Sequence, residues 1–326
     1  MGPVMTNVMA PAQVMPRGEQ AVGVELAAAA DLKQRIVEFV RAGSTEITPG
    51  DVRYLPELTA CLPAGTDIYV AHTPVASLQD VVHAALAVQR AGFSAMPHIA
   101  ARRIANAMAL RHALMELHAG GVQQILLVAG DASRPVGEFA NTLEIMDCGA
   151  LEDAGLARIG VAGHPEGHKA VGPLLLWEAL VAKQAFAARL GLQMHIVSQF
   201  GFNANAVAEW GHQLPRHQID LPVHVGIAGP AALSRLIQFA MKCGIGASLR
   251  TVMHNLSAVG SIAELAINPD QHLLRLLATP LPAGLRMVAP HFFAFGGCLP
   301  TARWMQQVAA GGFEIDTEAG RFRLQK

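Results

Sequence analysis

Four apolar, strand-like runs of this chain end in side chains that are able to take part in catalysis. These side chains are Glu46, Asp131, His164 with Glu166, and Gln199. In a (β/α)₈ barrel the carboxyl ends of the strands meet at one face, and the active site is built there. We therefore expect these residues to share one site.

The acid of the first run, Glu46, is a candidate proton donor. A carboxyl group that faces a barrel mouth is partly desolvated, which raises its pKa and allows it to give up a proton near neutral pH. The alternative is an ion pair with Arg53 or Arg102, and the sequence leaves both open.

Asp131 and Gln199 are candidate ligand-binding residues. Asp131 follows Gly130, which allows a flat ligand to approach the backbone closely, so that the carboxylate accepts hydrogen bonds from ring N–H groups. The alternative is a turn or N-cap residue. Gln199 lies in a run suited to burial, where an amide must satisfy both its donor and its acceptor. Either a ligand edge or an internal hydrogen bond to a neighbouring strand would do so.

The histidines near these runs do not predict a metal site. His164 and His168 have an HxxxH spacing, but Pro165 and Gly167 intervene, so we expect a loop and no metal. His98 and His291 each lie at the end of a strand-like run. An isolated histidine in such a place is more often a structural residue than a catalyst.

Eight strand-like runs alternate with helical patterns along the chain, as parallel strands joined by crossover helices do. We predict strands at Ser44–Pro49, Asp67–Thr73, Ser94–Ala100, Gln123–Gly130, Arg158–Gly163, Met194–Phe200, Val223–Ala228 and Arg286–Phe295. We predict helices at Leu55–Leu62, Leu78–Ala91, Arg102–Ala119, Asn141–Ala154, Gly172–Leu190, Ala204–Leu214 and Ala231–Cys243.

These elements predict a single (β/α)₈ TIM barrel over residues 23–326, since eight strands favour closure and no GxGxxG follows the first strand. A helix at Val24–Ala42 precedes the barrel. Extra helices are expected in Leu249–Leu277, before the eighth strand, where they would cover the mouth. Residues 1–22, rich in Met, Pro and Gly, are expected to be a disordered start and not a signal peptide.

The composition narrows the class of protein. Hydrophobic residues make up 52% and charged residues 15%, which suits a sheet buried on both faces. The formal net charge of −1 and an aromatic content of 5% do not favour nucleic acid as a partner. No apolar run is long enough for a membrane span. The four cysteines form no CxxC pair, so we expect free thiols and a cytoplasmic protein. The apolar surface that the composition implies is compatible with a homo-oligomer or a partner subunit.

Taken together, the strand ends resemble the methylenetetrahydrofolate reductase family of flavin-dependent (β/α)₈ barrels, from about Ser44 to Met305. Six short motifs carry the resemblance, in the family's order. They are Glu46-Ile47-Thr48-Pro49 (Glu-x-x-Pro), Pro97-His98-Ile99 (Pro-His-Leu), Val128-Ala129-Gly130-Asp131 (Arg-Gly-Asp), His164-Pro165-Glu166-Gly167-His168 (Tyr-Pro-Glu-x-His), Ser198-Gln199-Phe200 (Thr-Gln-Phe) and His291-Phe292-Phe293 (His-Phe-Tyr).

The resemblance implies an enzyme that interconverts 5,10-methylene- and 5-methyl-tetrahydrofolate by hydride transfer through FAD, with NAD(P)H as the reductant. It implies Glu46 as the general acid and Asp131 between flavin and pterin. It further implies Gln199, Phe200 and Asp131 as folate-binding residues. The flavin-binding residues that it implies are His98, Gly130, His164, Glu166, His168 and Lys183.

The departures from the family pattern concern the flavin phosphates. The Arg before Gly-Asp is Ala129, the loop Tyr is His164, only Lys183 remains of a Leu-Lys-x-Lys pattern, and the Asn-Arg after strand eight is Gly296-Gly297. Two alternatives therefore stand beside the flavoenzyme. One is a flavin-independent or partner-dependent C1-folate enzyme subunit, and the other is a non-catalytic folate-binding barrel.

Overall fold

The computed structural model of the chain describes residues 17–243, 266–279, 285–316 and 320–325. It contains a closed barrel of eight parallel strands, with the order β1-β10-β7-β6-β5-β4-β3-β2. The barrel strands are β1 (Ser44–Ile47), β2 (Asp67–Val70), β3 (Ser94–Ala100), β4 (Gln124–Val128), β5 (Arg158–Gly163), β6 (Gln193–Ser198), β7 (Val223–Ala228) and β10 (Met287–Phe293). The predicted TIM barrel is confirmed.

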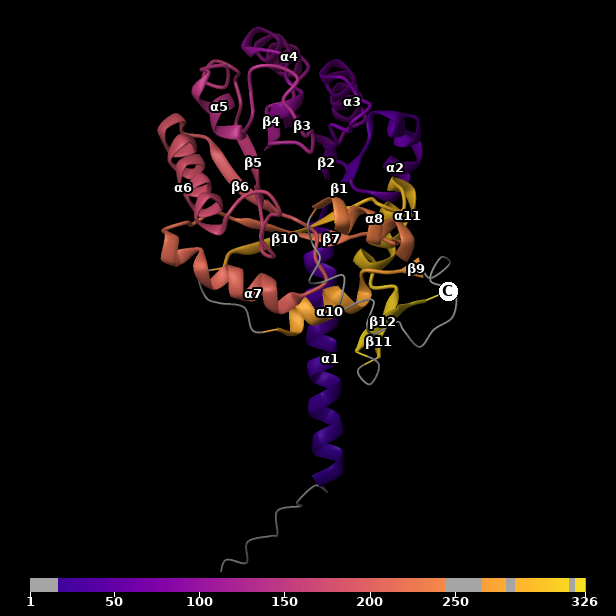
Figure 1. Ribbon diagram of the computed structural model, residues 1–326. Helices are drawn as coiled ribbons and strands as arrows, with labels where there is room; N and C mark the ends of the chain where they lie inside the picture. The colour runs from indigo at the N-terminus through magenta and orange to yellow at the C-terminus, as the bar shows by residue number, and fades with distance from the viewer. Residues whose placement is uncertain (1–16, 244–265, 280–284, 317–319, 326) are drawn as a thin grey trace, which may run out of the picture.

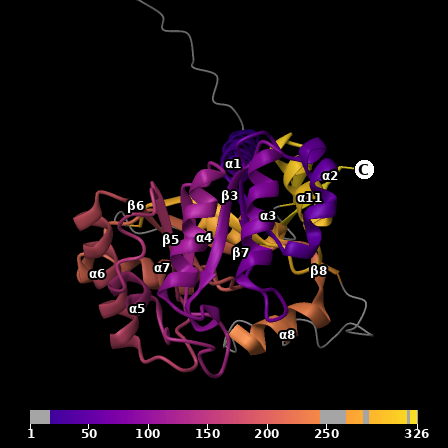
Figure 2. The same ribbon diagram turned by 90° about the horizontal axis from the view of Figure 1, so that it is seen from above.

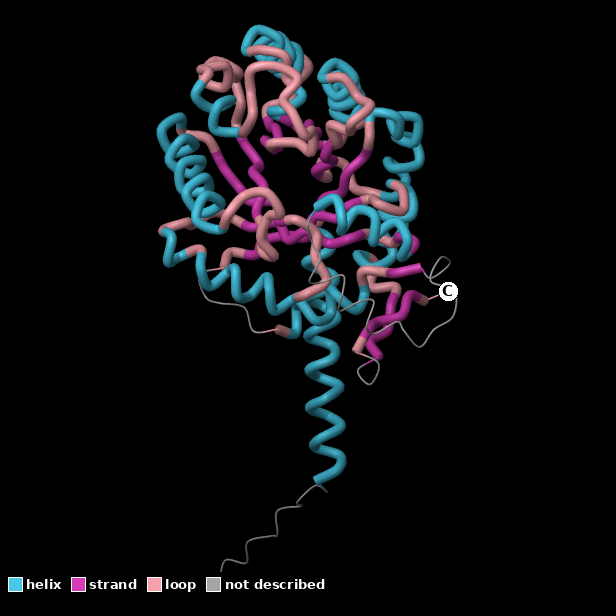
Figure 3. The backbone as a smooth tube through the Cα atoms, in the orientation of Figure 1, coloured by secondary structure: helices cyan, strands magenta, loops and turns pink. Residues whose placement is uncertain are grey.

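Helices surround the strands on all sides of the barrel (Figure 3). They are α1 (Arg17–Arg41), α2 (Leu55–Cys61), α3 (Leu78–Arg90), α4 (Ala107–Ala119), α5 (Thr142–Asp147), α6 (Pro173–Leu190), α7 (Ala204–Gln213), α8 (Leu233–Cys243), α10 (Asp270–Ala278) and α11 (Cys298–Ala309). The main differences from the prediction are at α5, which ends at Asp147 instead of Ala154, and at α4, which begins at Ala107 instead of Arg102. Residues Ala101–Arg103 form a separate 3₁₀ turn, and the Asn106 side chain then caps α4 by accepting a hydrogen bond from the Ala109 amide.

The N-terminal helix begins at Arg17 instead of Val24, so part of the predicted disordered start is helical. Residues 1–16 lie outside the described part of the chain. The C-terminal half of α1 packs on α10 and α11, where Lys33 donates to the Phe313 carbonyl (2.7 Å) and Arg35 to the Leu277 carbonyl (2.8 Å). Its N-terminal half extends away from the barrel (Figure 1).

Between β7 and β10 lie α8, as predicted at Ala231–Cys243, and α10, which falls in the Leu249–Leu277 region expected to hold extra helices; residues 244–265 are not described. Because α10 packs on α1, α7 and β12 in the layer of helices around the barrel, the expectation that it covers the mouth is wrong. In Figure 2, α8 lies at the edge of the molecule opposite α1. Two small antiparallel sheets were not predicted. One pairs β8 (Ala231–Ala232) with β9 (Ala266–Ile267), and the other pairs β11 (Phe313–Asp316) with β12 (Arg321–Leu324).

Side chains along each barrel strand point alternately towards the helices and into the lumen, so the barrel has two separate packed regions. Outward side chains such as Ile68, Ile99 and Ile196 join the main core between barrel and helices, whereas Tyr69 and Met96 belong to a small separate cluster in the lumen. This arrangement follows from the period of two along a strand.

The amino end of the lumen is closed by polar side chains from the first residues of four neighbouring strands. Arg158 Nη2 contacts both carboxylate oxygens of Asp67 at 2.7 Å, and Ser94 Oγ donates to Asp67 Oδ1 at 2.6 Å. Gln124 bridges Ser94 and Arg158. A charged pair in such a place needs these additional hydrogen bonds to offset its desolvation.

Four histidines fill much of the lumen above this network. They are His98 on β3, His195 on β6, His224 on β7 and His291 on β10. Tyr69 lies among them, with its hydroxyl 2.8 Å from His195 Nε2 and its ring centroid 4.4 Å from that of His291. Burial lowers the pKa of each imidazole, to about 3 for His98 and about 4 for His224. The rings are therefore neutral at pH 7.

This lumen predicts an acid-sensitive fold. A histidine whose pKa is lowered by folding contributes stability above its unfolded pKa of 6.5, and that stability is lost as the pH falls towards the folded value. We expect the free energy of unfolding in urea to fall between about pH 6.5 and 4, by up to about 1.4 kcal/mol per pH unit for each such group. His224→Leu should reduce this slope, whereas His112→Leu, at an exposed position on α4, should leave it unchanged. Equal slopes in all three proteins would contradict the assignment.

Candidate active site

Glu46, at the carboxyl end of β1, is the most strongly perturbed carboxyl group of the mouth. Its side chain is 15% exposed, and desolvation raises its pKa to about 7. A hydrogen bond from the Ala294 amide opposes the shift, and the charge of Asp51 adds to it. Among the described residues no arginine pairs with Glu46, and Arg53 instead lies over the Tyr54 ring. The geometry therefore favours the proton-donor interpretation over the ion pair.

The nearest titratable group to Glu46 is His291. Its Nε2 atom lies 4.0 Å from Glu46 Oε2, and its Nδ1 atom lies 2.9 Å from Ser44 Oγ. Ser44 and His291 are register partners on the adjacent strands β1 and β10, and both are buried. From the sequence, His291 was expected only to be a strand-end histidine of the kind that is more often structural. Its proximity to Glu46 depends on barrel closure, which brings the first and last strands together.

Asp131 lies at the outer edge of the mouth. Its side chain is 62% exposed and forms a 2.6 Å ion pair with Arg103 Nη2. Neither the turn nor the ligand interpretation included this pair. Gly130 has a φ of +86°, and a β-carbon there would lie 3.2 Å from the Ala100 side chain, so the backbone does come close to its neighbour at this point.

Gln199 is bonded to the loop that follows β5. In the amide orientation that satisfies both groups, its nitrogen donates to the Gly167 carbonyl (3.1 Å) and its oxygen accepts from the Glu166 amide (3.2 Å). The Glu166 carboxylate lies against Gly201, where a β-carbon would be 2.7 Å from Oε1. The internal hydrogen bond expected as the alternative is present, to this loop and not to a neighbouring strand. Gln199 therefore holds the loop in place.

The same loop brings basic side chains together. The His164 and His168 rings make an edge contact at 5.2 Å, and His164 interacts with the buried Lys183 of α6. Burial lowers the pKa of His164 to about 4 and that of Lys183 to about 8. Among the described residues no carboxylate pairs with Lys183, which leaves it suited to an anionic ligand.

Arg102 is a cation near this loop that motif comparison did not assign to the site. Its amide donates to the Ala129 carbonyl, its β-carbon faces Gly130, and its charge acts on His168. Its guanidinium donates to the Ala140 (2.8 Å) and Ala132 (3.1 Å) carbonyls, which holds the side chain against the loop after β4. The 3₁₀ turn after β3 thus supplies a cation close to the point where the family pattern has an arginine and this chain has Ala129.

Phe200 belongs to an aromatic cluster at the mouth, made of Phe200, Phe202, Phe239, Phe293 and Phe295. Phe200 is 1% exposed, with its ring centroid 4.6 Å from that of Phe295. Phe202 and Phe293 are half-buried. The cluster joins β6, α8 and β10 into an apolar wall, and Phe293 reaches the His291 ring at 4.8 Å.

His98 also lies in the mouth region, on β3. Its Nε2 atom is buried without a partner in the described part of the protein, as is Nε2 of His291. Buried polar atoms are usually hydrogen-bonded, so each of these nitrogens is available for one further hydrogen bond.

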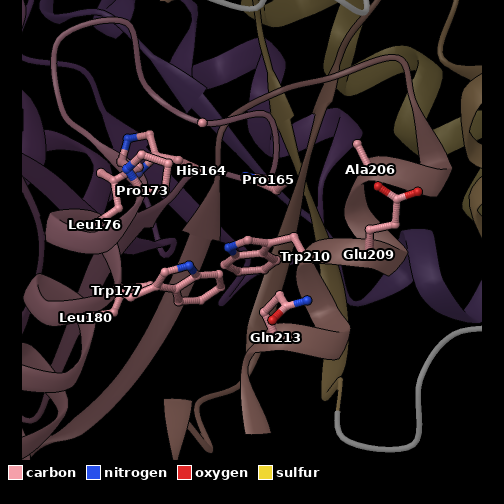
Figure 4. Close-up of a pocket in the computed structure, with 11 residues that line it drawn as sticks. His164, Pro165, Pro173, Leu176, Trp177, Leu180, Ala206, Glu209, Trp210 and Gln213 are labelled. Atoms are coloured by element: carbon pink, nitrogen blue, oxygen red, sulfur yellow. The ribbon is translucent and has the colours of Figure 1, made fainter. Parts of the chain in front are cut away.

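A pocket of about 340 Å³ opens on the outer side of the loop, between α6 and α7 (Figure 4). Trp177 and Trp210 stack there with ring centroids 6.1 Å apart, and Trp177 also stacks on His217 at 4.4 Å. His164 and Pro165 form one edge, and Glu209 and Gln213 lie on the other side. The loop motif His164–His168 forms one edge of this pocket, but the two tryptophans come from α6 and α7 and are not part of any motif quoted above.

Two further structural findings bear on the class of protein. Among the helices of the described residues, none is long and apolar enough to cross a bilayer. Within the same residues, no group of three or more His, Cys, Asp or Glu side chains is arranged to hold a metal ion.

Comparison with known proteins gives one family match. The model of the family described as methylenetetrahydrofolate reductase matches residues 59–260. Among solved structures, dihydropteroate synthase (FolP) from Thermus thermophilus has 14% identity and a TM-score of 0.40, over 82% of this chain and 92% of that one. A proposed phosphonomutase from Burkholderia cenocepacia has 12% identity and a TM-score of 0.39, over 69% and 97%. Neither structural similarity supports a conclusion about function.

The raised pKa of Glu46 predicts that this residue destabilises the fold as the pH rises, which is the opposite of the effect of the lumen histidines. Because folding raises the pKa of Glu46 from 4.5 to about 7, its contribution is fully present below pH 4.5 and is lost as the pH rises through about 7. Glu46→Gln should therefore be more stable than the parent at pH 8, by about 3 kcal/mol at most, with the difference disappearing near pH 4.5. Urea denaturation at both pH values measures this, and a destabilised variant at pH 8 would contradict it.

Proposed function

Because the chain belongs to the methylenetetrahydrofolate reductase family of folate-linked oxidoreductases, we propose that it interconverts 5,10-methylene- and 5-methyl-tetrahydrofolate with FAD, using NAD(P)H as the reductant. The observation that carries the proposal is the desolvated Glu46 at the barrel mouth, whose burial raises the pKa of the carboxyl group to about 7. Glu46 and His291 both lie outside the range matched by the family model, so the geometry supports the proposal independently.

The proton requirement of the reaction fits Glu46. Opening the bridged imidazolidine ring of methylene-tetrahydrofolate requires a proton on N10, which leaves the methylene carbon as an iminium on N5. A carboxyl group with a pKa of about 7 is both protonated often enough and acidic enough to supply this proton. The bound flavin supplies the hydride that the methylene carbon accepts, and the product is a methyl group.

The residues around the 163–168 loop fit a flavin dinucleotide. Lys183 and His168 offer donors for a diphosphate, and the Arg102 guanidinium, which donates to the Ala132 and Ala140 carbonyls, lies near them. Gly130 allows close approach of a flat ring. The orphaned His98 Nε2 offers a hydrogen bond to a ligand. His164 and Glu166 shape the loop. Asp131 is held at the rim of the mouth by its ion pair with Arg103. On the folate side we propose Gln199, Asp131 and the apolar wall around Phe200.

The Trp177–Trp210 pocket is the place we propose for the adenosine end of FAD. It adjoins His164 and Gly167, its indole rings suit stacking on a purine, and Glu209 and Gln213 carry acceptors for an exocyclic amine.

The first experiment tests the reaction itself. Purified protein supplied with FAD should show a flavin absorption band, and NAD(P)H followed by methylene-tetrahydrofolate under anaerobic conditions should yield methyl-tetrahydrofolate. Glu46→Gln should keep the flavin band and lose at least about a hundredfold in rate, as expected for loss of a general acid. Folate binding without flavin binding would instead favour a flavin-independent or partner-dependent enzyme. Absence of folate binding by calorimetry would reject the proposed substrate.

The second experiment tests the adenosine pocket. Trp177→Leu should weaken FAD binding by between about twofold and tenfold, the range for loss of one aromatic stacking contact. FMN lacks the adenosine group, so its affinity should not change, and it serves as the matched control. Equal effects on FAD and FMN, or no effect on either, would place the adenosine elsewhere.

A further inference from the structure

The side chain of Gln199 is bonded to the loop on the flavin side of the proposed site, although its expected role is on the folate side. We propose that Gln199 is also a positioning residue for the flavin half, because its amide fixes the turn His164–Gly167 that borders the residues proposed to hold FAD. The effect of this role on flavin binding rests on the proposed function, whereas the fixed turn does not depend on it.

The turn is built from residues that suit its conformation. The Gly167 amide donates to the His164 carbonyl at 3.0 Å, which closes a four-residue β-turn. Pro165 occupies the second position, where its fixed φ is favoured, and Gly167 has a φ of +79°, which glycine adopts without strain. One hydrogen bond is too weak to hold a loop in a single conformation, so the turn needs further contacts.

Gln199 supplies two of these contacts. Its nitrogen donates to the Gly167 carbonyl at 3.1 Å, and its oxygen accepts from the Glu166 amide at 3.2 Å. One primary amide thus satisfies a donor and an acceptor of the turn backbone at the same time. The chain that follows Gln199 stays beside the turn, because a β-carbon at Gly201 would lie 2.7 Å from Glu166 Oε1.

The backbone that carries this amide is itself firmly held. The Gln199 main-chain amide donates to the Gly163 carbonyl (2.8 Å) at the end of β5, and the Ser198 hydroxyl accepts from the Gly226 amide (2.8 Å) on β7. A β-carbon at Gly226 would lie 2.7 Å from the Gln199 carbonyl oxygen, so the two strands are in close contact there. Phe200, the next residue, is 1% exposed. The side chain therefore extends from a rigid strand end, which suits it to position a loop.

The turn connects this rigid strand end to the flavin side. His164, its first residue, interacts with Lys183 and contacts the His168 ring at 5.2 Å. His164 and Pro165 also line the Trp177–Trp210 pocket, at whose edge Figure 4 shows them. A displaced turn would therefore disturb both the donors proposed for the diphosphate and the pocket proposed for the adenosine.

The two roles of Gln199 lead to different results in protein without folate. If Gln199 only binds folate, its substitution leaves the affinity for FAD unchanged. If it positions the turn, its substitution weakens FAD binding, because FAD then binds well only to those molecules in which the turn is in place.

Amide hydrogen exchange, followed by NMR without flavin or folate, tests whether Gln199 fixes the turn. Gln199→Met keeps the length of the side chain and removes both polar groups. Exchange of the Glu166 amide should then become about threefold to tenfold faster, as expected for the loss of one or two hydrogen bonds. Gln199→Glu keeps an acceptor for this amide and should retain most of the protection. Equal exchange in the two variants would mean a general loosening of the loop and would overturn the proposal.

Gln184→Ala is the matched control, because Gln184 holds a different loop in the same way. Its side chain donates to the Gln218 carbonyl (2.8 Å) and accepts from the Asp220 amide (3.0 Å). This variant should speed exchange at Asp220 and leave the Glu166 amide unchanged. Exchange at Glu166 that stays at the parent rate in Gln199→Met would contradict the proposal.

Titration with FAD in the absence of folate tests the consequence for the flavin side. Gln199→Met should weaken FAD binding by about the factor by which it speeds exchange at Glu166, because both report how often the turn is in place. Phe293→Leu, in the apolar wall proposed for folate, should leave the affinity for FAD unchanged. Unchanged FAD affinity in Gln199→Met would overturn the positioning role. If the parent binds no FAD, the flavin part of the proposed function fails, and the exchange measurement still decides whether Gln199 fixes the turn.

Discussion

The structure depends on one constraint, which is that a closed eight-stranded barrel removes its lumen from solvent. Charged groups inside are penalised unless they are paired. The chain meets this constraint in two ways. At the amino end, Arg158 and Asp67 pair and are further bonded by Gln124 and Ser94. Above that network burial disfavours the charged forms, so the four imidazoles and the Tyr69 hydroxyl are neutral at pH 7 and the pKa of Glu46 is raised to about 7.

The same constraint affects both the pH dependence of stability and the chemistry of the carboxyl group at the mouth. The imidazoles lose their contribution as the pH falls below 6.5, whereas Glu46 loses its contribution as the pH rises from 4.5 through about 7, so the two effects oppose each other between these values. The carboxyl group at the mouth is costly to the fold when it is ionised. That same cost makes it an acid near pH 7, where a glutamate on the protein surface would be ionised almost completely.

The sequence predicts the barrel well because strand ends and helix patterns are local signals. β3, β5 and β7 begin and end as predicted, since their apolar runs are bounded by turn residues. The site is less predictable, because its contacts cross the barrel. The proximity of Glu46 to His291 requires the first and last strands to meet, and the turn after β3 brings Arg102 to Ala129 and Arg103 to Asp131. The tryptophans of the Trp177–Trp210 pocket come from two helices and belong to no motif.

The most direct test of the central claim is a rapid-mixing measurement of single turnover. Protein loaded with FAD and reduced is mixed anaerobically with methylene-tetrahydrofolate, and the return of flavin absorbance is followed from about pH 6 to 9. If Glu46 supplies the proton, the rate falls as the pH rises through about 7, and Glu46→Gln shows a much slower rate that does not depend on pH in this range. A Glu46→Gln variant with the rate and pH profile of the parent would contradict the account.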